Sequence, residues 1–395
     1  MKVLLTSHLF PNEVDPVSGV FVKEEAQFLT QRCELKIVAP IPWFPPLRGF
    51  GRWSRLSKIP YRQQVGSLDV FHPRYLLFPR RILFCTSWFF YLLALLQVGR
   101  KLEFDLVHAH VAYPDGLAAV LFSKITRRPV VITTHGGDVK TYPRERRIWK
   151  LLTVLALLKA DKIVAVSGDL KKAIRELGVD VEKVEVIPNG VDMTLFHPIA
   201  KSTAVAEKGI PNLARIIYVG RLEQQKGVEV LVRAMSMLVA TRKDLELTVV
   251  GANRAERGEA EVLTLTRQLG LEEKIRFIDA VPLYEVPLWI ATADVLVLPS
   301  FSEGFGLSLV EALACGKPVV STTCGGPEDI VTEKVGILVR PGDAKALARA
   351  IAYVLDHPEK YNPMEISSYA HQRFSLEKIS SQICDLYLSV GKVAC

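Results

Sequence analysis

The sequence predicts an α/β protein of two domains, each built on a parallel β-sheet with helices on both faces. Two observations carry this prediction. The chain has 395 residues, about twice the length of an ordinary domain. In both halves, short β-branched runs alternate with longer helical stretches, as they do where helices link the strands of a parallel sheet.

The composition excludes several classes of protein. Hydrophobic residues make up 49% of the chain and charged residues 23%, as in globular proteins with a full core. A disordered chain, a collagen and a small disulfide scaffold are therefore excluded. The formal net charge is +8, and residues 1–198 hold 28 Lys and Arg against 18 Asp and Glu. The positive charge therefore lies in the first half of the chain. Such a distribution indicates that the first half faces an anionic membrane, a phosphate-rich substrate or a nucleic acid.

The first half opens with an expected strand at 2–7, followed by a helix at 20–32. Phe21, Ala26, Phe28 and Leu29 give this helix its apolar period. Residues 41–60, rich in Pro, Gly, Trp and Arg, have no period and are expected to form a loop. The other elements expected here are strands at 35–39, 105–110, 130–134, 162–166 and 184–187, and helices at 115–125, 145–159 and 168–177.

The alternation of strand-like and helix-like segments becomes less regular after Pro188-Asn189-Gly190. Residues 198–213 are expected to form a linker between domains at 1–197 and 214–375. Ligands of open parallel sheets bind at the carboxyl ends of the strands, so the loops that follow the strands are the place to search for a site. The elements expected after the linker are strands at 215–219, 245–250, 274–278, 295–298 and 318–321, and helices at 227–240, 258–269, 284–292, 307–315, 343–355 and 376–390.

The cysteines and the apolar segments bear on the cellular compartment. The six cysteines form no C-x-x-C pair, and we expect free thiols in a reducing compartment. No signal-peptide pattern follows Met1, so we expect a cytoplasmic protein. Residues 82–98 carry no charge and lie between Arg80-Arg81 and Arg100-Lys101. A spanning helix needs about 20 apolar residues, so we expect a helix packed in or on the domain.

The segment from Pro299 to Glu311 predicts a ligand-binding loop between a strand and a helix. Gly304 and Gly306 would allow a ligand close to the backbone, and the helix start offers N–H groups to an anion. Glu303 on the loop and Glu311 in the helix could each accept hydrogen bonds from ligand hydroxyls. The alternative is a glycine-rich turn with two solvated glutamates.

A second strand-to-helix loop runs from Tyr218 to Gly227. Its Arg221 and Lys226 could converge on one anion, although two solvated cations remain the alternative. Together the two loops suggest a diphosphate held by the cations and hydroxyls held by the glutamates, which describes a nucleotide sugar. No D-x-D motif occurs, so a divalent metal on the diphosphate is not required, and the cations would stabilise the leaving group.

The motifs G-R-L-x-x-x-K-G and E-G-F-G-L-x-L-V-E resemble those of the retaining glycosyltransferases of family four (group 1), which have the GT-B fold. The first half adds matching segments around Gly19, at His108-Ala109-His110, at Thr134 to Asp138 and at Ile187 to Asp192. The resemblance covers most of the chain. It implies two Rossmann-like domains facing each other across a cleft, with the C-terminal helix, 376–395, completing the first domain.

The resemblance also implies roles for single residues. Gly19 would approach the diphosphate, and His135 would lie near the donor sugar. Glu303 and the amides of Phe305 to Leu307 would hold sugar hydroxyls, Glu311 would hold the ribose, and Val281 would flank the base. Arg221, Lys226, Glu303 and His135 would form the catalytic group. His108 and His110 end a strand, where we expect them to point to opposite faces, with one of them in the core.

Three positions depart from the family's pattern. Ser18 stands where many members have Gly, Ser308 stands where Pro is common, and residues 251–257 lack the usual Gly-x-Gly. The first two departures leave the family resemblance intact. The third concerns the contacts to the base of the donor.

The expected function is metal-independent transfer of a hexosyl unit from a nucleotide sugar, with a UDP-sugar as the expected donor and no resident cofactor. The expected acceptor is a membrane-proximal or lipid-linked glycan bound by the first domain. A nucleotide-sugar epimerase of the same fold and a non-catalytic, basic protein that binds membranes or nucleic acid remain alternatives. Removal of both glutamates would leave the function of the last class unchanged.

The basic and aromatic residues of the first half predict peripheral binding of the protein to the inner face of the plasma membrane. We do not expect nucleic acid as a partner. Arg80, Arg81, Arg100 and Lys101 bracket the apolar segment 82–98. Basic side chains favour an anionic bilayer, and aromatic side chains favour its interface. The loop residues expected at this surface are Trp43, Phe44, Arg48, Phe50, Arg52, Trp53, Arg55 and Lys58.

Overall fold

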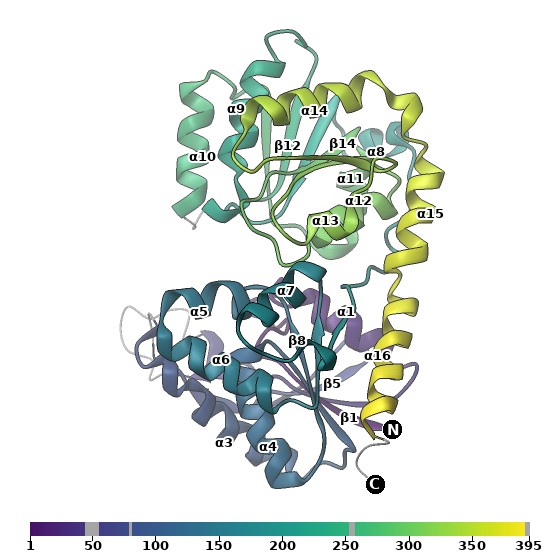
Figure 1. Ribbon diagram of the computed structural model, residues 1–395. Helices are drawn as coiled ribbons and strands as arrows, with labels where there is room; N and C mark the ends of the chain where they lie inside the picture. The colour runs from purple at the N-terminus through teal and green to yellow at the C-terminus, as the bar shows by residue number, and fades with distance from the viewer. Residues whose placement is uncertain (44–54, 79–80, 253–256, 392–395) are drawn as a thin grey trace. The chain divides into compact units, whose positions relative to one another are not determined.

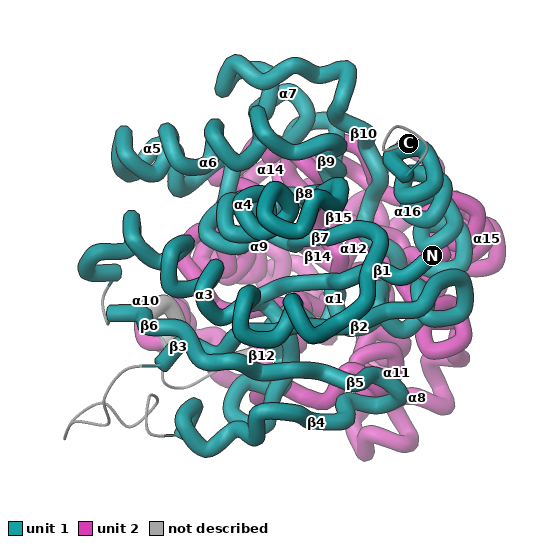
Figure 2. Tube along the Cα trace, turned by 90° about the horizontal axis from the view of Figure 1, so that it is seen from below, with its two compact units in different colours: residues 1–190, 376–395 teal, residues 191–375 magenta. Residues whose placement is uncertain are grey.

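The computed structural model describes residues 1–43, 55–78, 81–252 and 257–391. The chain divides into two compact units, residues 1–190 with 376–395 and residues 191–375, which Figure 2 shows in different colours. Each unit is an α/β layer built on its own sheet, and Figure 1 labels some of the strands, with β1, β5 and β8 in one sheet and β12 and β14 in the other. The fold class expected from the sequence is confirmed.

Unit 1 contains an eight-stranded sheet in the order β10-β9-β8-β7-β1-β2-β5-β4. All neighbours are parallel except β4 and β5, and β3 pairs separately with β6. The strands are β1 (Lys2–Thr6), β2 (Glu34–Val38), β3 (Ile41–Trp43), β4 (Arg62–Val65), β5 (Leu68–Phe71), β6 (Arg74–Leu76), β7 (Leu106–His110), β8 (Val130–Thr134), β9 (Lys162–Ala165) and β10 (Val184–Val186). The helices are α1 (Val20–Leu29), α3 (Ser87–Gly99), α4 (Leu117–Thr126), α5 (Tyr142–Glu145), α6 (Arg147–Lys159), α7 (Gly168–Glu176) and α16 (Leu376–Gly391).

Unit 2 contains a six-stranded, fully parallel sheet in the order β13-β12-β11-β14-β15-β16. Its strands are β11 (Arg215–Val219), β12 (Glu246–Ala252), β13 (Ile275–Asp279), β14 (Val295–Leu298), β15 (Val319–Thr322) and β16 (Gly336–Val339). Its helices are α8 (Lys201–Glu207), α9 (Val228–Leu238), α10 (Arg257–Gln268), α11 (Val286–Ala291), α12 (Leu307–Ala314), α13 (Pro327–Ile330), α14 (Ala344–Asp356) and α15 (Pro363–Phe374).

The segment expected to be a linker, 198–213, contains the helix α8. Lys201 at the start of α8 holds the carboxylate of Asp294 at 2.6 Å, and α8 also contacts α11. These contacts attach the segment to unit 2. The boundary between the units falls at residues 190 and 191.

The C-terminal helix α16 packs against the sheet of unit 1. Ile379, Ile383 and Tyr387 join a core cluster with Val3 of β1 and Leu106 of β7. All five side chains are buried. The last helix of the sequence therefore supplies part of the first unit's core.

The apolar segment 82–98 forms a short turn and then α3. One side of α3 is buried through Tyr91, Leu95 and Val98, and the helix packs against α4 and β6. Phe89 and Leu93 remain 45% and 48% exposed. Across the described residues, no helix combines the length and apolar content that crossing a membrane requires.

Candidate functional site

The two loops singled out in the sequence lie next to each other in unit 2. Their strands β11 and β14 pair in parallel, so both loops leave the same edge of the sheet. Phe301 donates its backbone N–H to the Gln225 carbonyl oxygen at 2.9 Å. The Gln225 amide in turn donates to the carbonyl oxygen of Ser302 at 3.1 Å.

Glycine makes this close approach of the loops possible. Gly227 has a φ of 64°, which strains any residue with a side chain. A Cβ atom there would collide with the carbonyl oxygen of Pro299, at the end of β14. Gly227 ends the loop that carries Arg221 and Lys226, so this glycine fixes how near the cations lie to the second loop.

Lys226 and Glu303 form an ion pair between the two loops, with the ammonium nitrogen 2.8 Å from Glu303 Oε1. Ser300 donates its hydroxyl to the same oxygen at 2.7 Å. The side chain of Glu303 is only 10% exposed. A solvated glutamate is therefore the wrong interpretation of this position, since burial of the carboxylate is offset by a cation and a hydroxyl.

Arg221 lies apart from this pair. Its guanidinium contacts Glu223 at 2.6 Å, and its side chain is 65% exposed. Arg221 and Lys226 therefore pair with two different carboxylates in this structure. Their convergence on one ligand anion stays a prediction. Tyr218 donates its hydroxyl to the Arg221 carbonyl oxygen at 2.7 Å, which fixes the backbone of the loop.

The second loop leads into α12. Gly306 caps the start of this helix with a φ of 102°, and Leu307 is the first helical residue. The first turn of a helix presents backbone N–H groups that its own carbonyls do not satisfy. Phe305 is buried, and its ring contacts Phe374. The loop around Gly304 thus joins the end of β14 to the first turn of α12.

Glu311 is buried within α12, where a surface glutamate was the alternative interpretation. It is 8% exposed, and burial raises its pKa to about 7. Val281 follows β13, the edge strand of this sheet, and is partly buried. The loop after β12, where the family's Gly-x-Gly pattern is missing, includes residues 253–256, which lie outside the described residues.

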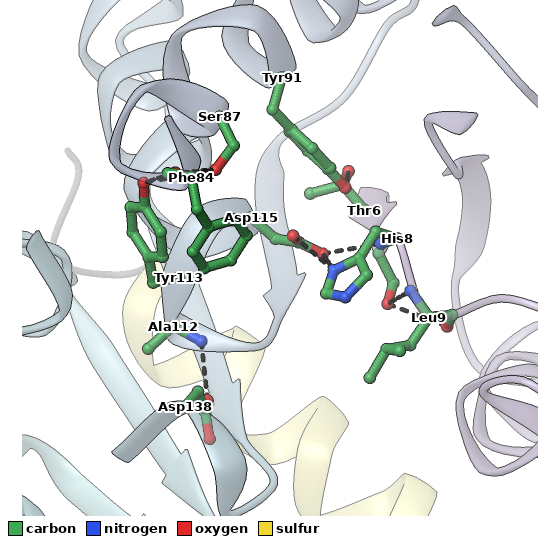
Figure 3. Close-up of polar contacts among 11 residues, drawn as sticks. Thr6, His8, Leu9, Phe84, Ser87, Tyr91, Ala112, Tyr113, Asp115 and Asp138 are labelled. Carbon is green, nitrogen blue, oxygen red and sulfur yellow. Dashed lines mark hydrogen bonds and ion pairs between the residues drawn. The ribbon is translucent and has the colours of Figure 1, made fainter. Parts of the chain in front are cut away.

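The carboxyl edge of the sheet in unit 1 carries a His–Asp pair that sequence reasoning missed (Figure 3). His8 follows β1, and its Nδ1 lies 2.7 Å from Oδ1 of Asp115, a fully buried residue. The His8 backbone N–H donates to Oδ2 of the same carboxylate at 2.7 Å. Burial disfavours the charge on His8, but the neighbouring Asp115 carboxylate outweighs it and raises the pKa of His8.

Asp138 organises the loop that follows β8. Its carboxylate accepts backbone N–H bonds from Ala112 at 2.8 Å, Gly136 at 2.9 Å and His135 at 3.2 Å, and Figure 3 shows the first of these. Burial nevertheless raises the pKa of Asp138. Asp138 thus ties the His135 loop to the loop after β7. The position of His8, Asp115 and Asp138 just beyond adjacent strands was the signal that could have revealed them.

The expectation that His108 and His110 point to opposite faces is wrong. Residues two apart in a strand point to the same face, and both rings are fully buried with centroids 4.5 Å apart. His110 Nδ1 lies 3.1 Å from His135 Nε2. Glu25 of α1 lies on the other side of His110, with 3.4 Å between Oε1 and Nε2.

The cluster of Glu25, His108 and His110 brings potential metal-ligand atoms within 4.8 Å of one another. Both nitrogens of His108 already have partners, however. Nδ1 lies 2.6 Å from the Tyr387 hydroxyl, and Nε2 lies 2.7 Å from Thr133 Oγ1. Two ligand atoms remain, fewer than the three that catalytic zinc sites use. We therefore assign no metal to the cluster.

Gly19 precedes α1 with a φ of 66°. A Cβ atom at this position would collide with the backbone of Leu9. Packing of the loop after β1 therefore already requires glycine here. The contact of Gly19 with a diphosphate stays a prediction.

Comparisons with known proteins match both units to models of glycosyltransferases. Residues 18–195 match the model of Glycosyltransferase Family 4, and residues 201–371 match that of Glycosyl transferases group 1. A D-inositol 3-phosphate glycosyltransferase of Catenulispora acidiphila is 31% identical over 72% of this chain and 70% of its own. The chain belongs to the family 4 (group 1) glycosyltransferases.

One relative of this glycosyltransferase aligns over nearly the whole chain. TuaC of Bacillus subtilis (strain 168), whose name assigns it to teichuronic acid biosynthesis, is 28% identical over 92% of this chain and 91% of its own.

Two solved structures show the GT-B fold. Sucrose-phosphate synthase from Thermosynechococcus elongatus aligns with a TM-score of 0.84, 22% identity and 99% coverage of both chains. Anabaena HepE in complex with UDP-glucose aligns with a TM-score of 0.76 and 22% identity, over 98% of this chain and 100% of that one.

Proposed function

We propose that this glycosyltransferase moves a hexosyl unit, with retention and without a metal, from a UDP-sugar to a membrane-proximal or lipid-linked glycan. Such an acceptor belongs to the synthesis of cell-surface polysaccharide or glycolipid. Unit 2 would bind the donor, and unit 1 would bind the acceptor. The site residues are Arg221, Lys226, Glu303 and His135 for the reaction, and Gly19, Val281, Gly304, Phe305, Gly306, Leu307 and Glu311 for the donor.

The observation that carries the donor assignment is the Lys226–Glu303 pair at the carboxyl edge of unit 2, 2.8 Å apart. It sets a cation and a hydrogen-bond acceptor side by side, next to the start of α12. A sugar diphosphate offers the matching groups, because its phosphates bind cations and helix N–H groups and its hydroxyls donate to carboxylates. HepE is similar in fold, and its structure with UDP-glucose motivates the choice of donor to test first.

The acceptor assignment is supported by the surface of unit 1. The helices α3, α4 and α6 pack side by side and contain no Asp or Glu. On α6, Ile148, Leu151, Leu155 and Leu158 are 40–61% exposed. They recur every three or four residues and therefore share one face of the helix. Exposed Arg147 and Lys150 lie on the same helix.

An anionic bilayer fits this α3/α4/α6 surface, because apolar side chains enter the interface while basic groups attract anionic headgroups. A water-soluble acceptor gives no reason for exposed leucines. Of the basic and aromatic residues expected here from the sequence, Phe44, Arg48, Phe50, Arg52, Trp53 and Arg80 lie outside the described residues.

A thermal-shift screen tests the donor assignment. We expect UDP-sugars to raise the unfolding temperature of the full-length protein, because a ligand that binds only the folded state stabilises it. UDP-glucose, UDP-galactose, GDP-mannose and ADP-glucose would be compared at equal concentration, with UMP as the control that lacks the β-phosphate. No shift with any diphosphate sugar would contradict the proposal, and release of UDP with a changed free sugar would indicate an epimerase.

A further inference from the structure

Two buried side chains of unit 1, Glu25 and His110, form a line with the partly buried His135. Glu25 Oε1 lies 3.4 Å from His110 Nε2, and neither of these two buried atoms has a hydrogen-bond partner among the described residues. His110 Nδ1 is hydrogen-bonded to His135 Nε2 at 3.1 Å. The two imidazole planes are nearly parallel, at 11° to each other, with ring centroids 5.3 Å apart. The residues come from α1, β7 and the loop after β8, so tertiary structure alone brings them together.

His135 Nδ1 is the outer end of this line. It is buried and has no hydrogen-bond partner among the described residues. Phe21 covers the ring, with centroids 4.7 Å apart. A buried polar atom without a partner is costly, so this nitrogen is suited to a group that arrives with a ligand.

We propose that Glu25, acting through His110, sets which nitrogen of His135 carries the proton, and thereby whether His135 Nδ1 accepts or donates a hydrogen bond to a ligand hydroxyl. Glu25 and His110 are positioning residues in this proposal. The identity of the ligand as a sugar rests on the proposed function, whereas the coupling of the three side chains does not.

The two states follow from counting protons. When Glu25 is a carboxylate, its charge favours a proton on the facing Nε2 of His110, so that His110 Nδ1 accepts from His135 Nε2–H and His135 Nδ1 keeps a lone pair. When Glu25 gains a proton, this charge is lost, His110 carries its proton on Nδ1 and donates to His135 Nε2, and His135 carries its proton on Nδ1. One proton added to Glu25 thus reverses the hydrogen bond between the two imidazoles and changes His135 Nδ1 from an acceptor to a donor.

Burial places this switch near neutral pH. It raises the pKa of Glu25 to about 7, although the neighbouring His108 ring opposes the shift. It lowers the pKa of His110 to about 3 and that of His135 well below its usual value. An added proton therefore goes to the carboxylate, and neither imidazole becomes charged.

The other titratable groups beside the line are held by their own bonds. His108 is bound by Thr133 and Tyr387, and burial lowers its pKa well below the usual value. Burial raises the pKa of Tyr387 well above its usual value. Asp138 accepts from the backbone N–H of His135 and not from its ring.

The test is the pH dependence of the ring-nitrogen NMR signals in full-length protein labelled with ¹⁵N-histidine. Loss of a signal in His110→Gln or His135→Gln assigns it. From about pH 8.5 to about pH 5.5, we expect the His135 proton to move from Nε2 to Nδ1 and the His110 proton from Nε2 to Nδ1, with one shared midpoint near 7. This titration needs only the wild-type protein.

Glu25→Gln should hold both rings in one tautomer over the whole range, because an amide cannot change its proton count. Glu24→Gln is the matched control, since Glu24 pairs with Lys23 at 3.1 Å and should leave the switch unchanged. The proposal would be overturned if the His135 tautomer did not change with pH in the wild type. It would also be overturned if the tautomer still changed with pH in Glu25→Gln.

Hydrolysis of UDP-glucose without acceptor adds a functional readout. We expect the pH profile of its kcat to flatten in Glu25→Gln, with wild-type dependence kept in Glu24→Gln. If no nucleotide sugar is hydrolysed while the tautomers still switch, the proposed function fails and the coupling stands. If hydrolysis occurs and the profile in Glu25→Gln is unchanged, the coupling has no role in the reaction and the inference is wrong.

Discussion

Lys226 lies 2.8 Å from Glu303, so the cation expected to bind a diphosphate is already neutralised by the carboxylate expected to bind a sugar. A donor that reaches this site must share Lys226 with Glu303 or replace it. The two residues are therefore expected to respond to mutation in opposite directions when free UDP is the ligand.

Lys226→Ala and Arg221→Ala should each weaken UDP binding, because each removes a hydrogen bond to a charged group worth about 1.5–3 kcal/mol. That corresponds to about a 10-fold to 150-fold rise in Kd. Isothermal titration calorimetry measures the change. Arg233→Ala, an exposed position on α9, is the control and should keep wild-type affinity. Near-normal affinity in both variants would remove the diphosphate assignment.

Glu303→Gln should keep or improve the affinity for free UDP, because Lys226 loses its anionic partner and becomes available to the phosphates. The same variant should slow UDP-glucose hydrolysis, because the proposed partner of Glu303 is the sugar. Calorimetry with UDP and a coupled assay for UDP release separate the two effects. A large loss of UDP affinity would show that Glu303 contributes to nucleotide binding.

Glu311 should make UDP binding depend on pH. Its pKa is raised to about 7, so it is largely protonated below that value, whereas the ribose hydroxyls bind best to the carboxylate. Affinity should therefore rise between about pH 6 and about pH 8 in the wild type and stay flat in Glu311→Gln. An identical pH profile in the two proteins would contradict the ribose assignment.

Glu311 should also make the free energy of unfolding depend on pH. The folded protein binds more protons than the unfolded chain between 4.5 and about 7, so the free energy of unfolding falls as pH rises through this window. Glu311→Gln should remove up to about 3 kcal/mol of this decrease. Urea unfolding at both ends of the window measures it.

Transfer and donor hydrolysis should survive excess EDTA, because Lys226 and Arg221 are proposed to stabilise the departing diphosphate. UDP release from UDP-glucose would be measured before and after chelation. Activity that disappears with EDTA and returns with Mn²⁺ or Mg²⁺ would contradict metal independence.

The α3/α4/α6 surface predicts binding to anionic vesicles. The protein should sediment with phosphatidylglycerol-containing liposomes at low salt, and added salt should release part of it, because surface attraction decays over about 8 Å at physiological ionic strength. Leu151→Ser combined with Leu155→Ser should reduce binding, whereas Leu388→Ser, equally exposed on α16 at 53%, should not. Absence of sedimentation at low salt would contradict membrane binding.

The buried parallel strands could be predicted from the sequence almost to the residue. β8, β11 and β14 have the expected bounds, because uninterrupted β-branched runs are typical of strands covered on both faces. The short strands β3 to β6 were missed, since three or four residues give too short a pattern for a period. The helix α15 was also missed, although Asn362 caps its start and Pro363 follows, a recognisable start signal.

The sequence was enough to predict which loops form the candidate site. It was not enough to predict which side chains of these loops contact each other. Glu303 and Arg221 were found because they follow strands, and that position depends on local sequence. The pairing of Lys226 with Glu303 joins residues 77 positions apart and depends on strand order. Glu25 gave no signal at all, because a glutamate in a helix is ordinarily solvated and only tertiary packing buries this one beside His110.

The position of α16 also has a consequence for synthesis of the chain. Unit 2 is continuous and can complete its core once residue 375 has left the ribosome, whereas the core of unit 1 includes Ile379, Ile383 and Tyr387. A nascent chain therefore holds residues 1–190 with part of their apolar surface uncovered until α16 has been made. His108 likewise gains its Tyr387 partner only then. A nonsense or frameshift change before residue 379 would therefore leave the core of unit 1 incomplete even though all of residues 1–190 had been made.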